Sequence, residues 1–101
     1  MNMKMINVVF DEVYNDVDLL RVPSEIADSI ELVVREFNYW LSDPNNQKPF
    51  LVPYGNKRMV LGVGTNEFLW WLNHVKIIDG DKATIVKQHT LFVEGLPKAD
   101  F

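Results

Sequence analysis

Apolar and polar residues alternate at the start of the chain with the period of a β-strand. Residues 4–10 place isoleucine, valine and phenylalanine at every second position, which predicts a strand with one side suited to a core. A polar turn is expected at 11–15. Residues 16–22 predict a second strand, because the residue before Pro23 is restricted to extended backbone.

Residues 25–42 instead carry apolar side chains every three or four positions, the pattern of an amphipathic helix. Ser24 is expected to cap its N-terminus, and the segment Asp43-Pro44-Asn45-Asn46 to end it. The apolar stripe comprises Ile26, Ile30, Val33, Val34, Phe37, Trp40 and Leu41.

A hairpin is expected next, with strands 50–54 and 57–63 joined by the two-residue loop Gly55-Asn56. Counting outward from that loop pairs Val52 with Met59. Pro53 cannot donate a hydrogen bond to a neighbouring strand and therefore favours an edge position.

The remaining pattern predicts a short helix at 66–73, with Thr65 as its cap, and a second hairpin. That hairpin would pair 75–78 with 82–88 around Asp79-Gly80-Asp81. Residues 82–94 are too long for one ordinary strand, so a break is expected near His89-Thr90. The residues after Gly95-Leu96-Pro97 are expected to fray.

The predicted order is β-β-α-β-β-α-β-β within one domain, residues 1–101. Strands joined by hairpins, with two helices between them, predict an α+β fold with a mostly antiparallel sheet and helices on one face. At 101 residues the chain is long enough for one core and too short for two.

Charge is unevenly distributed. Residues 1–45 hold nine acids and three bases, whereas residues 46–101 hold five acids and seven bases. No concentrated basic footprint indicates direct nucleic-acid binding, and the acidic half would attract basic surfaces. No signal-like segment or apolar run of membrane-spanning length occurs, and there is no cysteine. We therefore expect a cytoplasmic location and no membrane partner.

The sequence offers little for catalysis or cofactor binding. His74 and His89 lack zinc-ligand spacing, and both are expected to be structural or exposed. The turn Gly62-Val63-Gly64 lacks the further glycine or lysine of a phosphate-binding loop. Asp16-x-Asp18 lacks the glycine and terminal glutamate of a calcium loop. We therefore predict no enzyme activity, no catalytic residue, no cofactor and no metal.

Trp70 and Trp71 are adjacent on the second predicted helix, so their side chains point about 100° apart. A one-sided core accepts only one of them fully. The set of side chains that better fits a core-facing side of this helix is Phe68, Trp71 and Leu72, continued by Val75. Trp70 is therefore expected at the rim or on the surface, where tryptophan is often an interface hot spot.

The chain resembles, in general character, the small immunity proteins that protect bacteria from contact-dependent toxins. The likeness consists of a compact acidic chain without catalytic residues, an amphipathic helix beginning Val22-Pro23-Ser24-Glu25-Ile26-Ala27-Asp28, and acids concentrated in 11–28. Those proteins share no single motif, so no functional residue is carried over. The resemblance implies that a cognate toxin, often a basic nuclease, is inactivated because its active site is covered.

The first functional hypothesis is accordingly an inhibitor that steers to a basic toxin through acidic residues and holds it with an aromatic anchor. The alternatives are a structural or accessory interaction protein of phage or mobile-element origin acting as a homo-oligomer, a small enzyme using His74 or His89 with a carboxylate, and a small-ligand binder. The partner-binding residues predicted for the inhibitor are Asp11, Glu12, Asp16 and Asp18 for charge and Trp70 as anchor.

Overall fold

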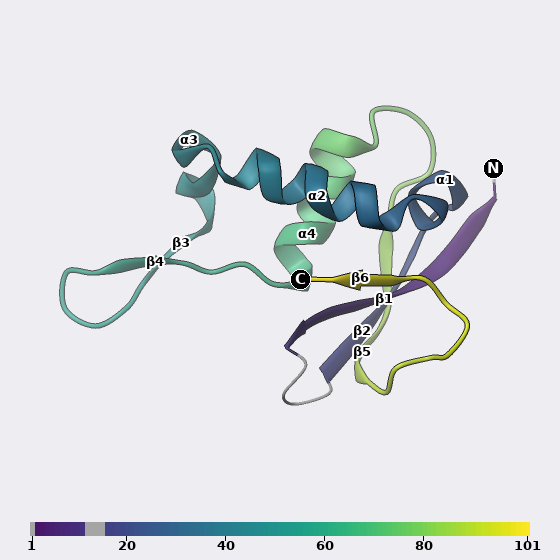
Figure 1. Ribbon diagram of the computed structural model, residues 1–101. Coiled ribbons are helices and arrows are strands. Elements are labelled where there is room, and N and C mark those ends of the chain that lie inside the picture. The colour runs from purple at the N-terminus through teal and green to yellow at the C-terminus, as the bar shows by residue number, and fades with distance from the viewer. Residues whose placement is uncertain (1, 12–15) are drawn as a thin grey trace.

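The computed structural model describes residues 2–11 and 16–101 and has the predicted α+β class (Figure 1). In chain order the elements are β1 (Met3–Asp11), β2 (Asp16–Pro23), α1 (Ser24–Asp28), α2 (Ile30–Leu41), α3 (Pro44–Gln47), the 3-10 turn η1 (Lys48–Phe50), β3 (Leu51–Pro53), β4 (Met59–Leu61), α4 (Thr65–Trp71), the π-helical turn η2 (Leu72–Lys76), β5 (Thr84–Thr90) and β6 (Lys98–Asp100).

The main sheet has the strand order β5-β2-β1-β6. Its β1–β2 and β2–β5 pairs are antiparallel, and β6 pairs with β1 in parallel.

The first two predicted strands are confirmed. The predicted hairpin of 75–78 with 82–88 is wrong, because residues 72–76 continue the helix as η2 and β5 pairs with β2 instead. The break expected near His89 is confirmed: β5 ends at Thr90, and His89 has a φ of 52°.

The single helix expected at 25–42 is interrupted at Ser29, which leaves helical backbone with φ −123° and ψ 35°. The predicted Ser24 cap is also wrong. Pro23 occupies the capping position, and the Ser24 hydroxyl is buried without a hydrogen-bond partner. Both helices contribute to the same core, α1 through Ile26 and α2 through Ile30.

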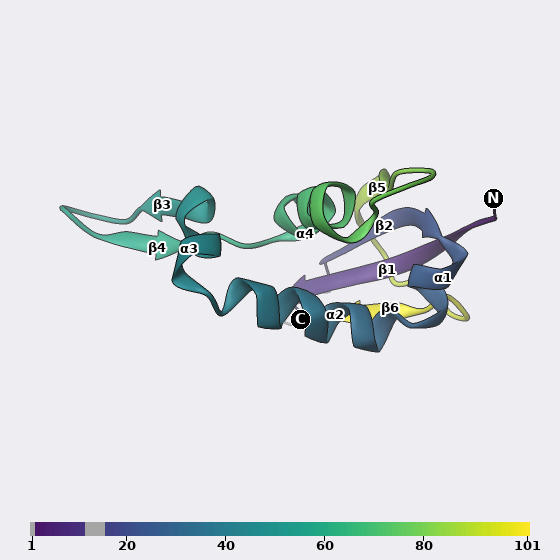
Figure 2. The ribbon, with the colours of Figure 1, turned by 90° about the horizontal axis from the view of Figure 1, so that it is seen from above.

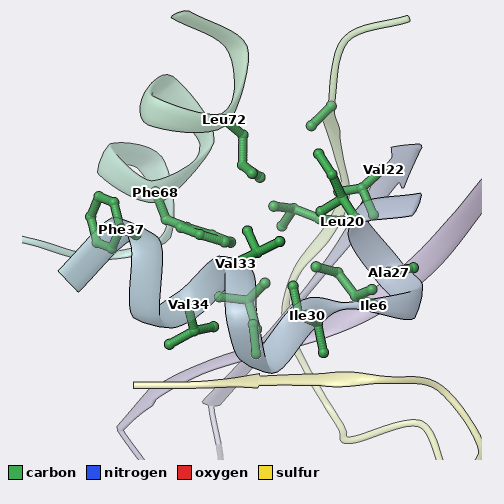
Figure 3. Close-up of a cluster of buried hydrophobic side chains, with 14 of the residues drawn as sticks. Ile6, Leu20, Val22, Ala27, Ile30, Val33, Val34, Phe37, Phe68 and Leu72 are labelled. Carbon is green, nitrogen blue, oxygen red and sulfur yellow. The ribbon is translucent and has the colours of Figure 1, made fainter. Parts of the chain in front are cut away.

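The core lies between the helices and one face of the sheet (Figure 3). Ile6 and Val8 of β1 and Leu20 and Val22 of β2 project from the sheet because they occupy alternate positions along their strands. The helices contribute most of the facing residues, which include Ala27, Ile30, Val33, Val34, Phe37, Phe68 and Leu72.

The other face of the sheet is covered by the chain between β5 and β6, which runs from one edge of the sheet to the other. Buried Asn7 holds this connection: its Nδ2 donates to Val93 O at 2.9 Å, and its Oδ1 accepts from Val93 N at 3.0 Å. The expected fraying after Pro97 is wrong. Ala99 is fully buried, and Phe101 N donates to Val9 O at 3.0 Å.

Strands β3 and β4 form a hairpin that extends away from the main sheet and helices (Figures 1 and 2). We call residues 51–61 the arm. Its predicted register is wrong by one residue, since Val52 pairs with Val60 and Pro53 with Met59. Tyr54 N donates to Arg58 O at 2.9 Å, which closes a three-residue loop. Positive φ angles at Gly55 and Lys57, 65° and 61°, accommodate that loop.

Candidate protein-binding surface

The arm exposes apolar side chains on both faces of a two-stranded hairpin. An ordinary hairpin on a globular body turns one apolar face inward and one polar face to water. In the arm neither face is buried, and six large hydrophobic residues are between 36% and 64% exposed. They are Leu51, Val52, Tyr54, Met59, Val60 and Leu61.

Aromatic rings fill the base of the arm. Phe50 is nearly buried there, with its ring centroid 6.0 Å from that of Trp40 and 5.7 Å from that of Trp70. Trp70 also stacks on His74 at 4.7 Å, and the His74 Nδ1 lies 2.8 Å from Trp70 O. These contacts on several sides fix the Trp70 ring, although it remains 40% exposed.

The predicted division of the two tryptophans is confirmed, since Trp71 is only 2% exposed. Its helix begins after Gly64, whose N–H donates to Glu67 Oε1 at 2.8 Å. The helix orients Phe68 and Leu72 into the core, and both are fully buried. Val75 does not continue this inward set as expected, because η2 changes the helical periodicity and leaves it exposed.

The arm is basic. Residues 51–61 contain two basic residues, Lys57 and Arg58, and no acid. The rest of the chain therefore holds the other eight bases and all fourteen acids, a formal net charge of −6.

Two of the predicted acidic residues lie near each other beside β5. Asp18 Oδ1 accepts a hydrogen bond from His89 N at 3.0 Å, and Asp16 Oδ2 lies 3.5 Å from His89 Nδ1. Asp11 pairs with Asp16 in the strand register. Glu12 lies outside the described residues. Asp18 therefore has a structural contact with the distorted end of β5, whereas Asp16 lies beside His89 and remains more than half exposed.

The described contacts do not join Trp70 to these acids. The ring neighbours of Trp70 come from α2, η1 and η2, whereas Asp16 and Asp18 contact β5. The predicted partner-binding residues are thus split between two parts of the molecule. The apolar arm adjoins Trp70, and sequence reasoning missed it as a surface.

The histidines have structural contacts. His89 and Asp16 are the one His–acid pair within 4 Å that the described residues provide, and their side chains are 75% and 57% exposed. This solvated pair gives the enzyme hypothesis no support, because a catalytic acid–base pair functions in a shaped, water-restricted site. Within residues 2–11 and 16–101, no group of three or more potential metal-ligating side chains occurs. No described helix is long and apolar enough to cross a membrane.

No protein-family model matches the chain, and no curated protein or solved structure matches it significantly.

Proposed function

We propose that this chain is a non-catalytic protein-binding module whose contact surface is the arm together with Trp70. The observation that carries the proposal is the arm's exposed apolar surface, which extends from a base of packed aromatic rings. Contiguous apolar surface on a folded domain favours burial against a partner. Trp70 would serve as a hot spot, since a ring already held in place loses little conformational entropy on binding.

Site-specific photo-crosslinking in the source cells tests this proposal. A photoreactive phenylalanine analogue at position 54 should give a discrete adduct with a protein. The same analogue at position 39, on the exposed side of α2, should not give that adduct. The absence of any protein adduct from position 54 would refute the proposal.

Purified components provide the second half of the test. Met59→Asp should weaken binding of the crosslinked partner at least tenfold, because it places a charge in the apolar contact. Leu32→Asp is the matched control, since Leu32 is similarly exposed but lies on α2. Equal affinities for the two variants would contradict the assignment of the arm.

The immunity-type inhibitor is a narrower proposal within this class. Its support is the net charge of −4 and the exposed Asp16 beside Asp18. These acids would steer to the positive groove of a toxin such as a nuclease and cover its active site. The expected result is that Asp16→Lys slows association with a toxin encoded by the neighbouring gene. If neither Asp16→Lys nor added salt changes the association rate constant, electrostatic steering through Asp16 is excluded.

The alternative proposal, an interaction protein acting as a homo-oligomer, is favoured by the arm's own chemistry. A basic, apolar arm fits an acidic partner better than a basic toxin. The acidic body of the same chain provides such a partner.

A further inference from the structure

A hollow lies between α1 and the chain that follows η2. Its floor includes Ile26, Val33 and Ile77, and its rim includes Glu25 and Asp79. Its volume is about 250 Å³, enough for one aromatic side chain. Ile78 also lines the hollow and is 90% exposed, which extends the apolar surface beyond the floor.

The charge of the hollow is opposite to that of the arm. Lys76 also lines it, but Lys76 Nζ is paired with Glu36 Oε2 at 2.6 Å. Glu25 and Asp79 form no ion pair among the described residues. The nearby Lys82 Nζ instead donates to Ile77 O at 2.7 Å and Asn73 O at 3.0 Å, so both rim carboxylates remain available to a cation. The tip of the arm offers the complement: a largely exposed Tyr54 ring with Lys57 and Arg58 beside it.

A chain cannot bring its own arm to its own hollow. The arm and α1 lie at opposite ends of the molecule in both views (Figures 1 and 2), and the longest extent is 45 Å. Two copies lying side by side in opposite directions, however, would bring each arm to the other copy's hollow. Opposite charges at the two ends favour this arrangement electrostatically.

We infer that the arm's partner is a second copy of this chain, with Tyr54 seated in the hollow beneath α1 and the Lys57–Arg58 side chains against Glu25 and Asp79. The inference rests on the proposed function of the arm. Both contacts are made twice in such a dimer, which closes with two-fold symmetry and leaves no arm free. The two reciprocal arms and their receiving surfaces can approach the roughly 20–30 residues a side of a stable interface.

A charge exchange tests the inference with purified full-length protein. The basic tip is reversed in one variant, Lys57→Asp with Arg58→Glu, where aspartate is chosen because it tolerates positive φ. The acidic rim is reversed in the other, Glu25→Lys with Asp79→Lys. The wild type is expected to sediment at twice the 11.7 kDa chain mass. Each variant alone should dissociate roughly tenfold or more readily, because like charges then meet at both contacts.

An equimolar mixture of the two variants should restore the dimer, because each arm then meets a rim of opposite charge. This recovery also establishes that both variants fold. Lys87→Glu and Glu94→Lys are the controls: each reverses an exposed charge outside both contacts and should leave the dimer intact. Raising the salt concentration should weaken the wild-type dimer.

Several outcomes would overturn the inference. They are a wild type that stays monomeric at several hundred micromolar, variants that dimerise like the wild type, a mixture that stays monomeric, and a ladder of larger oligomers in place of a closed dimer. Crosslinking at position 54 separates these failures from failure of the proposed function. An adduct with a different protein would refute self-association and retain a protein-binding arm, whereas an adduct with lipid or nucleic acid alone would refute both.

Discussion

Two asparagines bind distant backbone in the same way. Asn7 uses its amide to satisfy both the N–H and the C=O of Val93, and Asn73 does the same for Ala83. Each side chain thereby imitates a neighbouring strand, which offers one donor and one acceptor to the residue opposite. Asn7 holds the connection that crosses the face of the sheet opposite the helices, and Asn73 holds the chain that leads into β5.

Replacing Asn7 should destabilise the fold because the connection loses both hydrogen bonds that hold Val93 to the sheet. We expect Asn7→Ala to lower the free energy of unfolding by about 2–3 kcal/mol, because two part-buried hydrogen bonds and the packing of a fully buried side chain are lost. Asn38→Ala, an exposed site on α2, should change it by less than about 0.5 kcal/mol. Urea denaturation measures both, and similar effects for the two variants would contradict the role assigned to Asn7.

Side-chain direction on a helix could be predicted from the sequence, but the role of Asn7 could not. Trp70 and Trp71 were separable because neighbours on a helix point in different directions, a purely local property. For Asn7 the sequence indicates only a polar residue within a strand, because its hydrogen-bond partner Val93 lies 86 residues away. No local pattern identifies a hydrogen bond of that separation.

At the scale of elements, β6 has an importance out of proportion to its three residues. It follows a proline and a glycine, features that predict chain ends, yet it pairs with central strand β1. Phe101 directly after it stacks on Phe10 with centroids 4.1 Å apart and meets the edge of Phe68 at 4.8 Å. These ring contacts extend the core to the end of the described chain.

Truncating Phe101 should therefore affect stability more than truncating another phenylalanine outside the core. We expect Phe101→Ala to cost about 2 kcal/mol, less than a fully buried ring because Phe101 is half-buried. Phe92→Ala, in the exposed connection before β6, is the matched control and should cost under about 1 kcal/mol. Thermal unfolding of both proteins gives the comparison. Equal losses would mean that β6 frays as its sequence suggests.

The element boundaries that sequence reasoning located correctly have local causes. Strands β1 and β2 follow from alternation and from Pro23, and the end of α2 follows from the Asp43–Asn46 segment. The arm's register failed because Gly55-Asn56 suits a two-residue loop, while the fold accommodates Lys57 at positive φ as a third loop residue. The pairing of β5 with β2 depends on the whole sheet, so a local hairpin rule selected the wrong partner.

For the whole molecule, the arm enlarges the overall dimensions but contributes no residue to the core. The Cα radius of gyration is 14.0 Å, against about 13 Å for a compact domain of this length. The excess fits an extended element, and the described core cluster contains no residue of the arm. The α+β class could be predicted because it depends on the number and type of elements. The projecting arm could not, because its apolar residues read equally well as core.

Removing the arm's tip should leave the fold intact while abolishing its association. Residues 52–60 can be replaced by Asn-Gly, a loop suited to joining the paired residues Leu51 and Leu61. The expected unfolding temperature stays within a few degrees of the wild type, because Phe50 and the aromatic base are retained. The radius of gyration of the monomer, measured by small-angle X-ray scattering, should fall toward about 13 Å, and dimerisation should be lost.

A full-length Tyr54→Ser variant controls for chain length: it should weaken the dimer and keep the larger monomer radius. An unfolded deletion variant would instead place the arm within the cooperative folding unit, and a folded variant that still dimerises would exclude the arm as the contact surface.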